Sequence, residues 1–542
     1  MATTMSDTGT LNFLWSQALV AGFAAAGATH AVLSPGSRST PLALALLRQP
    51  GLHCTVAIDE RCAAFFALGL AKASRRPVLL LATSGTAPAN WQPAVIEASQ
   101  AGVPLILLSA DRPPELQDCG ANQTIEQTGL FGAHVRASHA LGTPEAGFAP
   151  GWLHRLTTRI VEQSQWPHPG PVHVNQPFRE PLVPAGEIPA VGEALPTIHA
   201  SPPQLLPDPV AIQQLASAIA GRPGAIVCGE LPATAGLAEA LTALADRLNC
   251  PLLAEPLSGL RFGRHERKHL CVRYNRWLAD PNSAERLRPQ WVLRFGAFPV
   301  TRRLQDYVAS ATSIHALVEP WPRWSDPSHS LTHLLRAAPL AACQALLAAA
   351  PAAGADDWLT AFMAQEQNAT GDDSAWHIPA LLAELPAGMP LFIGNSLAIR
   401  QLDSESGSGE KPLLFYGNRG ASGIDGNIST AMGIAAYHGR VVALLGDLTA
   451  QHDLGGLALA AGRDAIIVTI NNGGGGIFDL LPQAGLPEFE QGWRTPQQIS
   501  FEHAAATFGL GYAQANDRVT LGKALRQALA AGGPRLIEVV LP

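Results

Sequence analysis

The sequence predicts an α/β fold built from three doubly wound parallel-sheet domains, and three observations support this. Short apolar runs of strand length alternate with helical segments along the 542 residues, which is typical of parallel sheets covered by helices. At roughly 100–200 residues per domain, a chain of this length holds about three domains. Two passages rich in proline, 181–209 and 336–356, interrupt the alternation. We therefore expect domains at 1–190, 205–355 and 370–542.

The first domain shows the alternation most clearly. A helix over 11–26 precedes a strand over 30–33, a helix over 60–74 precedes a strand over 78–82, and a helix over 88–101 precedes a strand over 105–109. A later strand covers 172–175. Polar loops follow these strands at 34–37, 83–87 and 111–114. Ligands of doubly wound sheets meet the loops at the carboxyl ends of strands, so we expect the functional residues there.

The second and third domains repeat the pattern. In the second we expect strands at 225–228, 251–254, 291–295 and 313–318, with a helix over 236–248. In the third we expect strands at 391–393, 413–415, 441–445, 465–470 and 536–540. These runs are apolar on both faces, as strands buried between two helical layers are.

The composition excludes several classes of protein. The net charge is −7 and no basic run is present, which argues against nucleic-acid binding. The longest apolar runs, 77–82 and 104–110, fall far below the roughly 20 residues of a membrane span, and the first ten residues lack a signal-peptide pattern. The seven cysteines form no C-x-x-C pair, so we expect reduced thiols in a cytoplasmic protein.

One pair of loops in the third domain predicts a site for a metal-bound diphosphate. Gly446 and Asp447 follow one apolar strand, and Asn472 follows the next, 25 residues after Asp447. Strand, helix and strand at this spacing return both side chains to the same sheet edge. A carboxylate, an amide oxygen and a glycine carbonyl suit Mg²⁺, and the glycines 473–476 let backbone N–H groups face phosphate. Either loop by itself is also typical of an ordinary turn.

An acid in the first domain completes the candidate chemistry. Glu60 follows the apolar residues 56–58 and begins a helix. An acid at a helix start is common, because it favours the helix dipole. A half-buried carboxyl group at this place would have a raised pKa. It could also hydrogen-bond an aminopyrimidine ring and promote the imino tautomer that activates a thiazolium carbon. The two regions together suggest thiamine diphosphate.

Seven motifs in order strengthen this interpretation. They read SPGSRSTP (34–41), DER (59–61), TSGTA (83–87), ADRPPEL (110–116), CGANQ (119–123), GNS (394–396) and NRGASGIDG (418–426). With the Gly-Asp and Asn-Asn segments, they resemble the thiamine diphosphate-dependent decarboxylase and synthase superfamily. Within it they are most similar to the MenD family, the 2-succinyl-5-enolpyruvyl-6-hydroxy-3-cyclohexene-1-carboxylate synthases of menaquinone biosynthesis. The similarity covers both outer domains, while the middle domain matches weakly apart from Thr301-Arg302-Arg303-Leu304.

The resemblance implies a reaction, two substrates and an assembly. It implies decarboxylation of 2-oxoglutarate and 1,4-addition of the resulting carbanion equivalent to isochorismate. It makes 1–190 the pyrimidine-binding domain and 370–542 the diphosphate-binding domain. In this superfamily the acid-bearing domain of one chain faces the metal-bearing domain of another, so a homodimer or homotetramer is implied. Mg²⁺ is the implied metal, with Mn²⁺ as an alternative.

The resemblance also assigns roles to individual residues. Glu60 is the cofactor-activating acid, and Ile424 is the apolar support of the bent cofactor. The remaining cofactor contacts are Pro35, Asn395, Ser396, Gly423, Gly446, Leu448, Thr449, Gly475 and Ile477. The metal ligands are Asp447, Asn472 and Gly474 through its carbonyl. The substrate pocket comprises Ser37, Arg38, Arg112, Asn122, Gln123, Arg302, Arg303, Ser396, Arg400 and Arg419, with the apolar wall Ile477, Phe478 and Leu481. Arginine suits dianionic substrates because its planar fork grips a carboxylate with two hydrogen bonds.

Some positions depart from the expected pattern. Leu448 stands where many superfamily members have glycine, in agreement with the MenD family. Arg302 stands where lysine is expected. Gly473 and Gly476 replace expected polar residues, which predicts a more flexible loop.

Two alternatives stay open on the sequence. Another thiamine diphosphate-dependent 2-oxoacid decarboxylase or carboligase would share the fold, although no His-His pair of the kind several decarboxylases use occurs in the N-terminal half. A non-catalytic paralogue acting as a binding subunit is the third hypothesis. The presence of both Glu60 and Asp447 argues against it.

Overall fold

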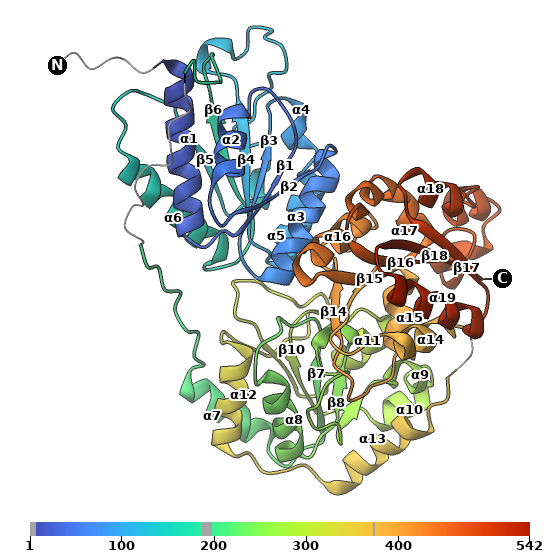
Figure 1. Ribbon diagram of the computed structural model, residues 1–542. Coiled ribbons are helices and arrows are strands. Elements are labelled where there is room, and N and C mark those ends of the chain that lie inside the picture. Colours follow the sequence, from blue (N-terminus) through green and yellow to red (C-terminus); the bar gives the residue numbers. More distant parts are fainter. Residues whose placement is uncertain (1–6, 187–197, 372–373, 542) are drawn as a thin grey trace.

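The computed structural model describes residues 7–186, 198–371 and 374–541. It contains three six-stranded sheets in which every strand pairing is parallel (Figure 1). Each of the three expected domain ranges encloses one sheet. The expected linker lies partly outside the described residues, at 187–197, as do the outermost residues of the first and third domains.

The first and third sheets share one topology. The first has the order β2-β1-β3-β4-β6-β5 and the third β14-β13-β15-β16-β18-β17. In both, the strand order reverses between the first and third strands, and such a switch point is where ligands bind in open α/β sheets. The first sheet comprises β1 (His30–Leu33), β2 (His53–Val56), β3 (Val78–Ala82), β4 (Leu105–Asp111), β5 (Ala137–Ala140) and β6 (Val172–Pro177). The third comprises β13 (Pro390–Ile393), β14 (Leu414–Gly417), β15 (Arg440–Gly446), β16 (Asp464–Asn471), β17 (Gly511–Ala515) and β18 (Pro534–Val540).

The central sheet has a different order, β12-β11-β10-β7-β8-β9. Three doubly wound sheets were expected and are confirmed, but only the outer two repeat one topology. The central strands are β7 (Gly224–Cys228), β8 (Leu252–Ala254), β9 (Leu270–Cys271), β10 (Trp291–Phe295), β11 (Ile314–Val318) and β12 (His333–Leu335).

Helices cover both faces of each sheet. The first domain contains α1 (Thr8–Ala25), α2 (Thr40–Arg48), α3 (Glu60–Ser74), α4 (Thr86–Ala89), α5 (Gln92–Ala101) and α6 (Pro150–Gln165). Around the central sheet lie α7 (Pro209–Ile219), α8 (Leu237–Leu248), α9 (Tyr274–Trp277), α10 (Pro281–Arg286), α11 (Arg302–Ala309), α12 (Pro339–Ala349) and α13 (Asp356–Asn368). The third domain contains α14 (His377–Glu384), α15 (Leu397–Glu405), α16 (Asn427–His438), α17 (Asp447–His452), α18 (Phe501–Thr507) and α19 (Arg518–Ala531).

One predicted boundary was wrong for an identifiable reason. The single helix expected over 88–101 is two helices, α4 and α5. Pro93 lies in the first turn of α5, where an N–H group has no partner within the helix and its absence costs nothing. Inside a continuous helix, proline would remove a backbone hydrogen bond and break the helix. Strand β2 ends at Val56 shortly before α3, and Ile58 between them is 86% exposed.

The first and third domains share one hydrophobic core. Helix α3 is buried from Cys62 to Ala71, because its outer face packs on α16 of the third domain. A Cβ on Gly69 would lie 2.0 Å from the carbonyl oxygen of Thr430, and one on Gly433 would lie 2.1 Å from that of Phe66. The two helices therefore approach at backbone distance. Burying Phe65 and Phe66 here contributes about 1.5–3 kcal/mol each, so the two outer sheets are firmly joined (Figure 1).

A buried ionic network joins the central and third domains. Arg261 and Asp403 form an ion pair with both side chains fully buried. The hydroxyl of Tyr274 and the amide of Asn275 donate to the same carboxylate, each at 2.5 Å. Since Asp403 lies on α15, this network holds that helix against the central domain.

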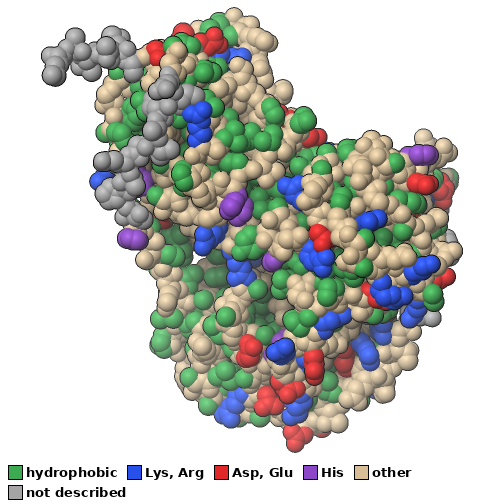
Figure 2. Space-filling view, in the orientation of Figure 1, with side chains coloured by type: hydrophobic (Ala, Val, Ile, Leu, Met, Phe, Trp, Pro, Cys, Tyr) green, Lys and Arg blue, Asp and Glu red, His purple; other side chains and the backbone are tan. Residues whose placement is uncertain are grey.

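Over the described residues, no helix is both long and apolar enough to cross a membrane. Five of the seven cysteines are buried and none is in a disulfide. On the face shown in Figure 2, basic and acidic side chains are interspersed.

Candidate active site

The carboxyl ends of four neighbouring strands in the third sheet carry the predicted metal and cofactor residues. Strand β14 leads into Asn418, β13 into Asn395, β15 into Asp447, and β16 ends at Asn471 beside Asn472. Gly446 pairs with Ile470 in the register of β15 and β16. The expected return of Asp447 and Asn472 to one sheet edge is therefore present in the structure.

Asp447 is a buried acid without an ion-pair partner among the described residues. Its carboxylate accepts hydrogen bonds from the backbone N–H of Leu448 and of Gly474, each at 2.7 Å. Burial raises its pKa, and these N–H groups oppose the rise. A buried carboxylate that no basic side chain pairs with favours a cation, so the residue fits a metal ligand.

Asn472 and the glycine loop complete this end of the site. The side-chain oxygen of Asn472 makes no hydrogen bond among the described residues, and the Arg494 guanidinium donates to its backbone carbonyl at 2.5 Å. The described residues contain no cluster of three histidine, cysteine or acidic side chains able to hold a metal. A bound cation would therefore rely on Asp447, the Asn472 amide, a backbone carbonyl and oxygens of its ligand, a set that suits Mg²⁺.

Contacts with the segment around Arg494 hold the glycine loop (473–476), whereas the sequence predicted a more flexible loop. Arg494 forms an ion pair with Asp479 and its carbonyl accepts from the N–H of Gly475 at 2.7 Å. Gly474 has φ +124°, and a Cβ there would lie 2.2 Å from the Arg494 carbonyl oxygen. A Cβ on Gly476 would lie 2.3 Å from the Asn472 side-chain nitrogen. The positive φ and the backbone contact therefore require glycine at 474, whereas the neighbours of Gly476 are the ends of movable side chains. Arg494 was missed from the sequence because no motif spacing marks it.

Asn395 and Arg419 form the other end of the same edge. Asn395 donates to the carbonyls of Asn418 at 2.9 Å and Gly423 at 2.7 Å, and accepts from Arg419 at 2.6 Å. Ser396 has φ +64°, an uncommon conformation for a non-glycine residue and one that is frequent at functional sites. Its carbonyl accepts from the guanidinium of Arg400 at 2.8 Å.

Two arginines at this end of the edge lie close enough to repel each other. The pKa of Arg400 is lowered by burial and by the charge of Arg419. Two guanidinium groups placed together in this way could bind a carboxylate. Ile424 lies half-buried nearby in the loop between β14 and α16.

The carboxyl edge of the first sheet presents a second pair of arginines. Arg38 is buried, donates to Glu180 and to the Phe178 carbonyl, and keeps a buried Nε without a partner among the described residues. Arg112 donates to the Ser84 hydroxyl at 3.0 Å, and burial together with the charge of Arg38 lowers its pKa. The ion pair with Glu180 gives the charge of Arg38 a structural partner as well.

The loops around this pair carry the other first-domain candidates. Pro35 and Ser37 are exposed on the loop after β1, and Asn122 and Gln123 are exposed on the loop after β4. Gln123 has φ +55°, and its carbonyl accepts from the Ser84 hydroxyl at 2.9 Å. The two loops thus flank the same sheet edge as Arg38 and Arg112.

Glu60 is half-buried, and none of the described residues forms a hydrogen bond or ion pair with it. It begins α3, whose cap Asp59 accepts from the Cys62 N–H at 3.0 Å. The first turn of α3 meets Asp453, which ends α17, whereas Asp447 begins that helix. Six residues of helix span about 9 Å. Within this chain the first turn of α3, which Glu60 begins, therefore lies at the end of α17 opposite Asp447.

Several remaining candidates do not join these clusters within the chain. Arg302 is 84% exposed and pairs with Asp306 on its own helix. Arg303 donates to the Asn275 carbonyl at 2.7 Å, which places it beside the Asp403 network. Leu481 is exposed at the end of the segment that carries Ile477 and Phe478, and its neighbour Leu480 is 73% exposed.

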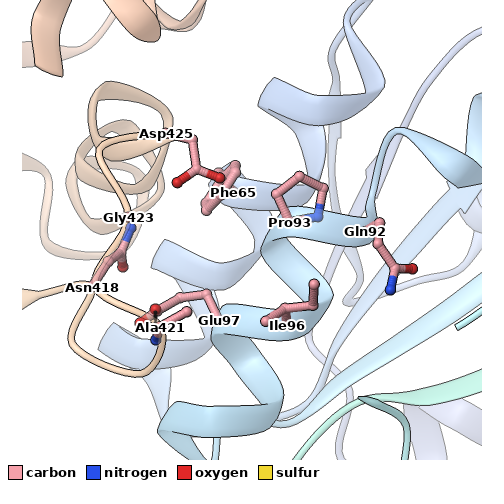
Figure 3. A pocket seen from close by; sticks show the side chains of 9 residues that line it. All are labelled: Phe65, Gln92, Pro93, Ile96, Glu97, Asn418, Ala421, Gly423 and Asp425. Atoms are coloured by element: carbon pink, nitrogen blue, oxygen red, sulfur yellow. Dashed lines mark hydrogen bonds between the residues drawn. The ribbon is translucent and has the colours of Figure 1, made fainter. Parts of the chain in front are cut away.

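A hollow of about 250 Å³ lies between the first and third domains, close to the Arg419 loop. Figure 3 shows α3 and α5 on one side, with Phe65 and Pro93, and Asn418 to Asp425 on the other. Glu97 on α5 points toward the loop at Ala421. Sequence reasoning missed Glu97, although it is the single charged residue in α5 and lies among buried alanines and valine.

Comparison with known proteins places the whole chain in one group. Models of the thiamine pyrophosphate enzymes match three segments: the N-terminal thiamine pyrophosphate-binding domain at 15–130, the middle domain at 206–374 and the C-terminal thiamine pyrophosphate-binding domain at 408–539. Thiamine pyrophosphate is the same compound as thiamine diphosphate.

Three relatives that match over nearly their full length share one name. A 2-succinyl-5-enolpyruvyl-6-hydroxy-3-cyclohexene-1-carboxylate synthase of Dechloromonas aromatica is 64% identical over 535 residues, covering 99% of both chains. Synthases of the same name from Geobacillus kaustophilus and Haloarcula marismortui are 41% and 39% identical and cover 97% and 98% of this chain and 94% and 95% of their own. A benzoylformate decarboxylase structure from Polynucleobacter necessarius superposes with TM-score 0.72 at 18% identity, covering 97% of this chain and 98% of its own, which shows the shared fold.

Proposed function

The chain belongs to the family of 2-succinyl-5-enolpyruvyl-6-hydroxy-3-cyclohexene-1-carboxylate synthases, and we propose that it joins 2-oxoglutarate and isochorismate with loss of CO₂. The observation that carries this proposal is the 64% identity over 99% of both chains. The reaction is a decarboxylating carbon–carbon bond formation within menaquinone biosynthesis.

The arginine pairs support dianionic substrates. Arg38 with Arg112, and Arg400 with Arg419, each place two positive charges together at a sheet edge. A guanidinium grips a carboxylate with two parallel hydrogen bonds. We assign substrate carboxylates to these pairs, with Ser37, Asn122 and Gln123 at the rim and Ile477, Phe478 and Leu481 as an apolar wall. Low polarity at such a wall favours loss of CO₂.

Thiamine diphosphate, when bound, supplies the electron sink for loss of CO₂ and for the new bond. Asp447, Asn472 and the Gly474 carbonyl would hold Mg²⁺ and through it the diphosphate. Gly446, Leu448, Thr449 and Gly475 would line the diphosphate, while Asn395, Ser396, Gly423 and Ile424 would hold the rings. The carboxylate of Glu60 would exchange a proton with the aminopyrimidine ring, beside Pro35.

We propose that two copies build each site. The Glu60 carboxylate has no hydrogen-bond or ion-pair partner among the described residues, and Glu60 begins a helix whose first turn contacts Asp453, at the other end of α17 from Asp447. The exposed Ile58 beside it, and the exposed Leu480 beyond the glycine loop, are large apolar side chains that a second copy would cover. On this arrangement Glu60 of one chain serves Asp447 of the other.

The test of the activity is an ultraviolet assay of isochorismate consumption with 2-oxoglutarate, thiamine diphosphate and Mg²⁺, omitting each component in turn. Consumption that needs every component is expected. Release of CO₂ without isochorismate consumption would identify a plain 2-oxoacid decarboxylase. Cofactor binding with no turnover would identify a non-catalytic paralogue.

The shared site has its own test. Glu60→Gln and Asp447→Ala are each expected to be inactive, and mixed dimers of the two would regain one complete site. Recovery of up to about half of the activity per mixed dimer is expected, since one of two sites is intact. No recovery in mixed dimers that are demonstrated by differential tagging would place both residues of a site in one chain.

A further inference from the structure

The loop that carries Arg419 is held from the first domain as well as from its own, where Asn395 donates to the Asn418 and Gly423 carbonyls. The ammonium of Lys72 on α3 donates to the Gly417 carbonyl at 2.5 Å. The carboxylate of Glu97 on α5 accepts from the N–H of Gly420 at 2.8 Å and from that of Ala421 at 2.6 Å. The Gly417 carbonyl before Arg419, and the N–H groups of Gly420 and Ala421 after it, are thus bound by two side chains of the first domain.

The two anchoring side chains also pair with each other, away from water. The Lys72 nitrogen lies 3.6 Å from a Glu97 oxygen, and their side chains are 8% and 4% exposed. Hydrogen bonds to an ionised group are roughly twice as strong as neutral ones. Glu97 therefore fixes the two N–H groups more firmly than a neutral residue would.

The loop lies directly on α5 at this point. A Cβ on Gly420 would lie 2.5 Å from the backbone carbonyl oxygen of Glu97 and 2.7 Å from the nitrogen of Ala101. Beside this contact lies the hollow of Figure 3, so the loop lacks packing on that side. Glu97 accordingly supplies support that side-chain packing does not.

Arg419 lies between the backbone atoms bound by Lys72 and Glu97 and the carboxyl edge of the third sheet. Its guanidinium donates to Asn395 at 2.6 Å, and its charge lowers the pKa of Arg400. The direction of the guanidinium depends on the backbone at 417–421, because only one side-chain bond holds it.

We propose that Glu97, neutralised by Lys72, is a positioning residue that sets the Arg419 guanidinium for the anionic substrate. This inference rests on the proposed function. It predicts that substrate steps, and not cofactor binding, depend on Glu97. A purely structural tie between domains would instead weaken stability without a specific kinetic effect.

The test compares Glu97→Ala and Glu97→Gln as holoenzymes with Mg²⁺ and thiamine diphosphate. Misplacing a reacting group by about 1 Å can cost ~100-fold in rate, so a loss of kcat/KM of at least about tenfold is expected for Glu97→Ala. Glutamine keeps one acceptor oxygen, so a smaller loss is expected for Glu97→Gln. Glu162→Ala, which removes an exposed acid on α6, is the matched control and should leave kcat/KM unchanged.

The decisive measurement repeats Glu97→Ala in an Arg419→Ala background. If Glu97 acts through Arg419, its effect on kcat/KM falls there to less than about twofold, because interacting residues are non-additive. An equal loss in both backgrounds would overturn the inference while leaving the proposed function intact, since the unmodified enzyme would still be active. Should Glu97→Ala not fold, Glu97→Gln completes the same cycle. An unmodified enzyme that does not consume isochorismate would overturn the proposed function first.

Discussion

Neutralising Asp447 should abolish the stabilisation that cofactor and metal give to the protein. In the structure this carboxylate is 6% exposed and accepts two backbone N–H bonds at 2.7 Å. Asp447→Asn preserves its size and one acceptor oxygen, and removes a charge that burial disfavours. We therefore expect the apo protein to change by no more than about 1 kcal/mol, the net worth of one hydrogen bond.

The holo protein should differ much more. A ligand present at 100 times its Kd stabilises by about 2.7 kcal/mol. If the loss of the anionic ligand weakens binding by ~100-fold, that gain falls to about 0.4 kcal/mol. With about 2–4 °C per kcal/mol for domains of this size, a shift of roughly 5–10 °C should shrink to about 1 °C.

The assay is a thermal melt with Mg²⁺, with thiamine diphosphate, and with both, at fixed concentrations. Glu502→Gln on α18 is the matched control, because it removes an exposed negative charge from the same domain. It should retain the full shift. An Asp447→Asn protein that still gains the wild-type shift from both components together would refute the metal assignment.

Four further predictions concern other residues. Glu60→Gln should keep the cofactor-induced melting shift but lower turnover by about 10²–10⁴-fold, the usual worth of a general acid–base group. Arg419→Ala should keep the same shift and raise the KM of a substrate or lower kcat/KM. Asp403→Ala should destabilise by about 3–5 kcal/mol in urea unfolding, since it strands the buried Arg261. His173 is buried and its pKa is lowered to about 4, so it contributes stability above pH 6.5 that is lost as pH falls toward 4. His173→Phe should therefore remove up to about 3 kcal/mol of that pH dependence.

Each of these has an outcome that contradicts it. Near-normal turnover of Glu60→Gln would remove its assigned role, and loss of the cofactor shift in Arg419→Ala would reassign that residue to cofactor binding. An Asp403→Ala protein as stable as wild type would show that water or a rearrangement of neighbouring side chains stabilises the unpaired charge of Arg261. If the urea midpoint of His173→Phe changes with pH between 4 and 7 as strongly as that of the unmodified protein, other groups cause the loss of stability in acid.

The central strands were predictable because their sequence signal is local. Strand β10 was located at the correct residues, and β7, β11 and β16 within one residue at each end, since buried parallel strands read as continuous apolar runs. The edge strands β5 and β17 were missed. They are half-exposed, with burial alternating or partial along their length, so no apolar run marks them.

The sequence predicted the residues of the candidate site but not the residues that support its loops. Asp447, Asn472 and Glu60 stand out because their residue types follow strands at a helical interval. Lys72 and Glu97 contact the Arg419 loop from more than 300 residues away in the chain, and Arg494 contacts the glycine loop from a segment without a motif. Likewise Gly473 and Gly476 suggested flexibility, whereas close contacts with the segment around Arg494 hold the loop.

The sequence by itself determined the α/β class, the three sheets, the cofactor type and the family, because strand periodicity and short motifs depend on neighbouring residues only. The tertiary structure alone decided which topology each sheet has, that α3 and α16 join the outer domains in one core, and that the first turn of α3 lies at the other end of α17 from Asp447. Those facts depend on contacts between residues hundreds of positions apart. Such contacts form through the burial of whole faces, which no local pattern specifies.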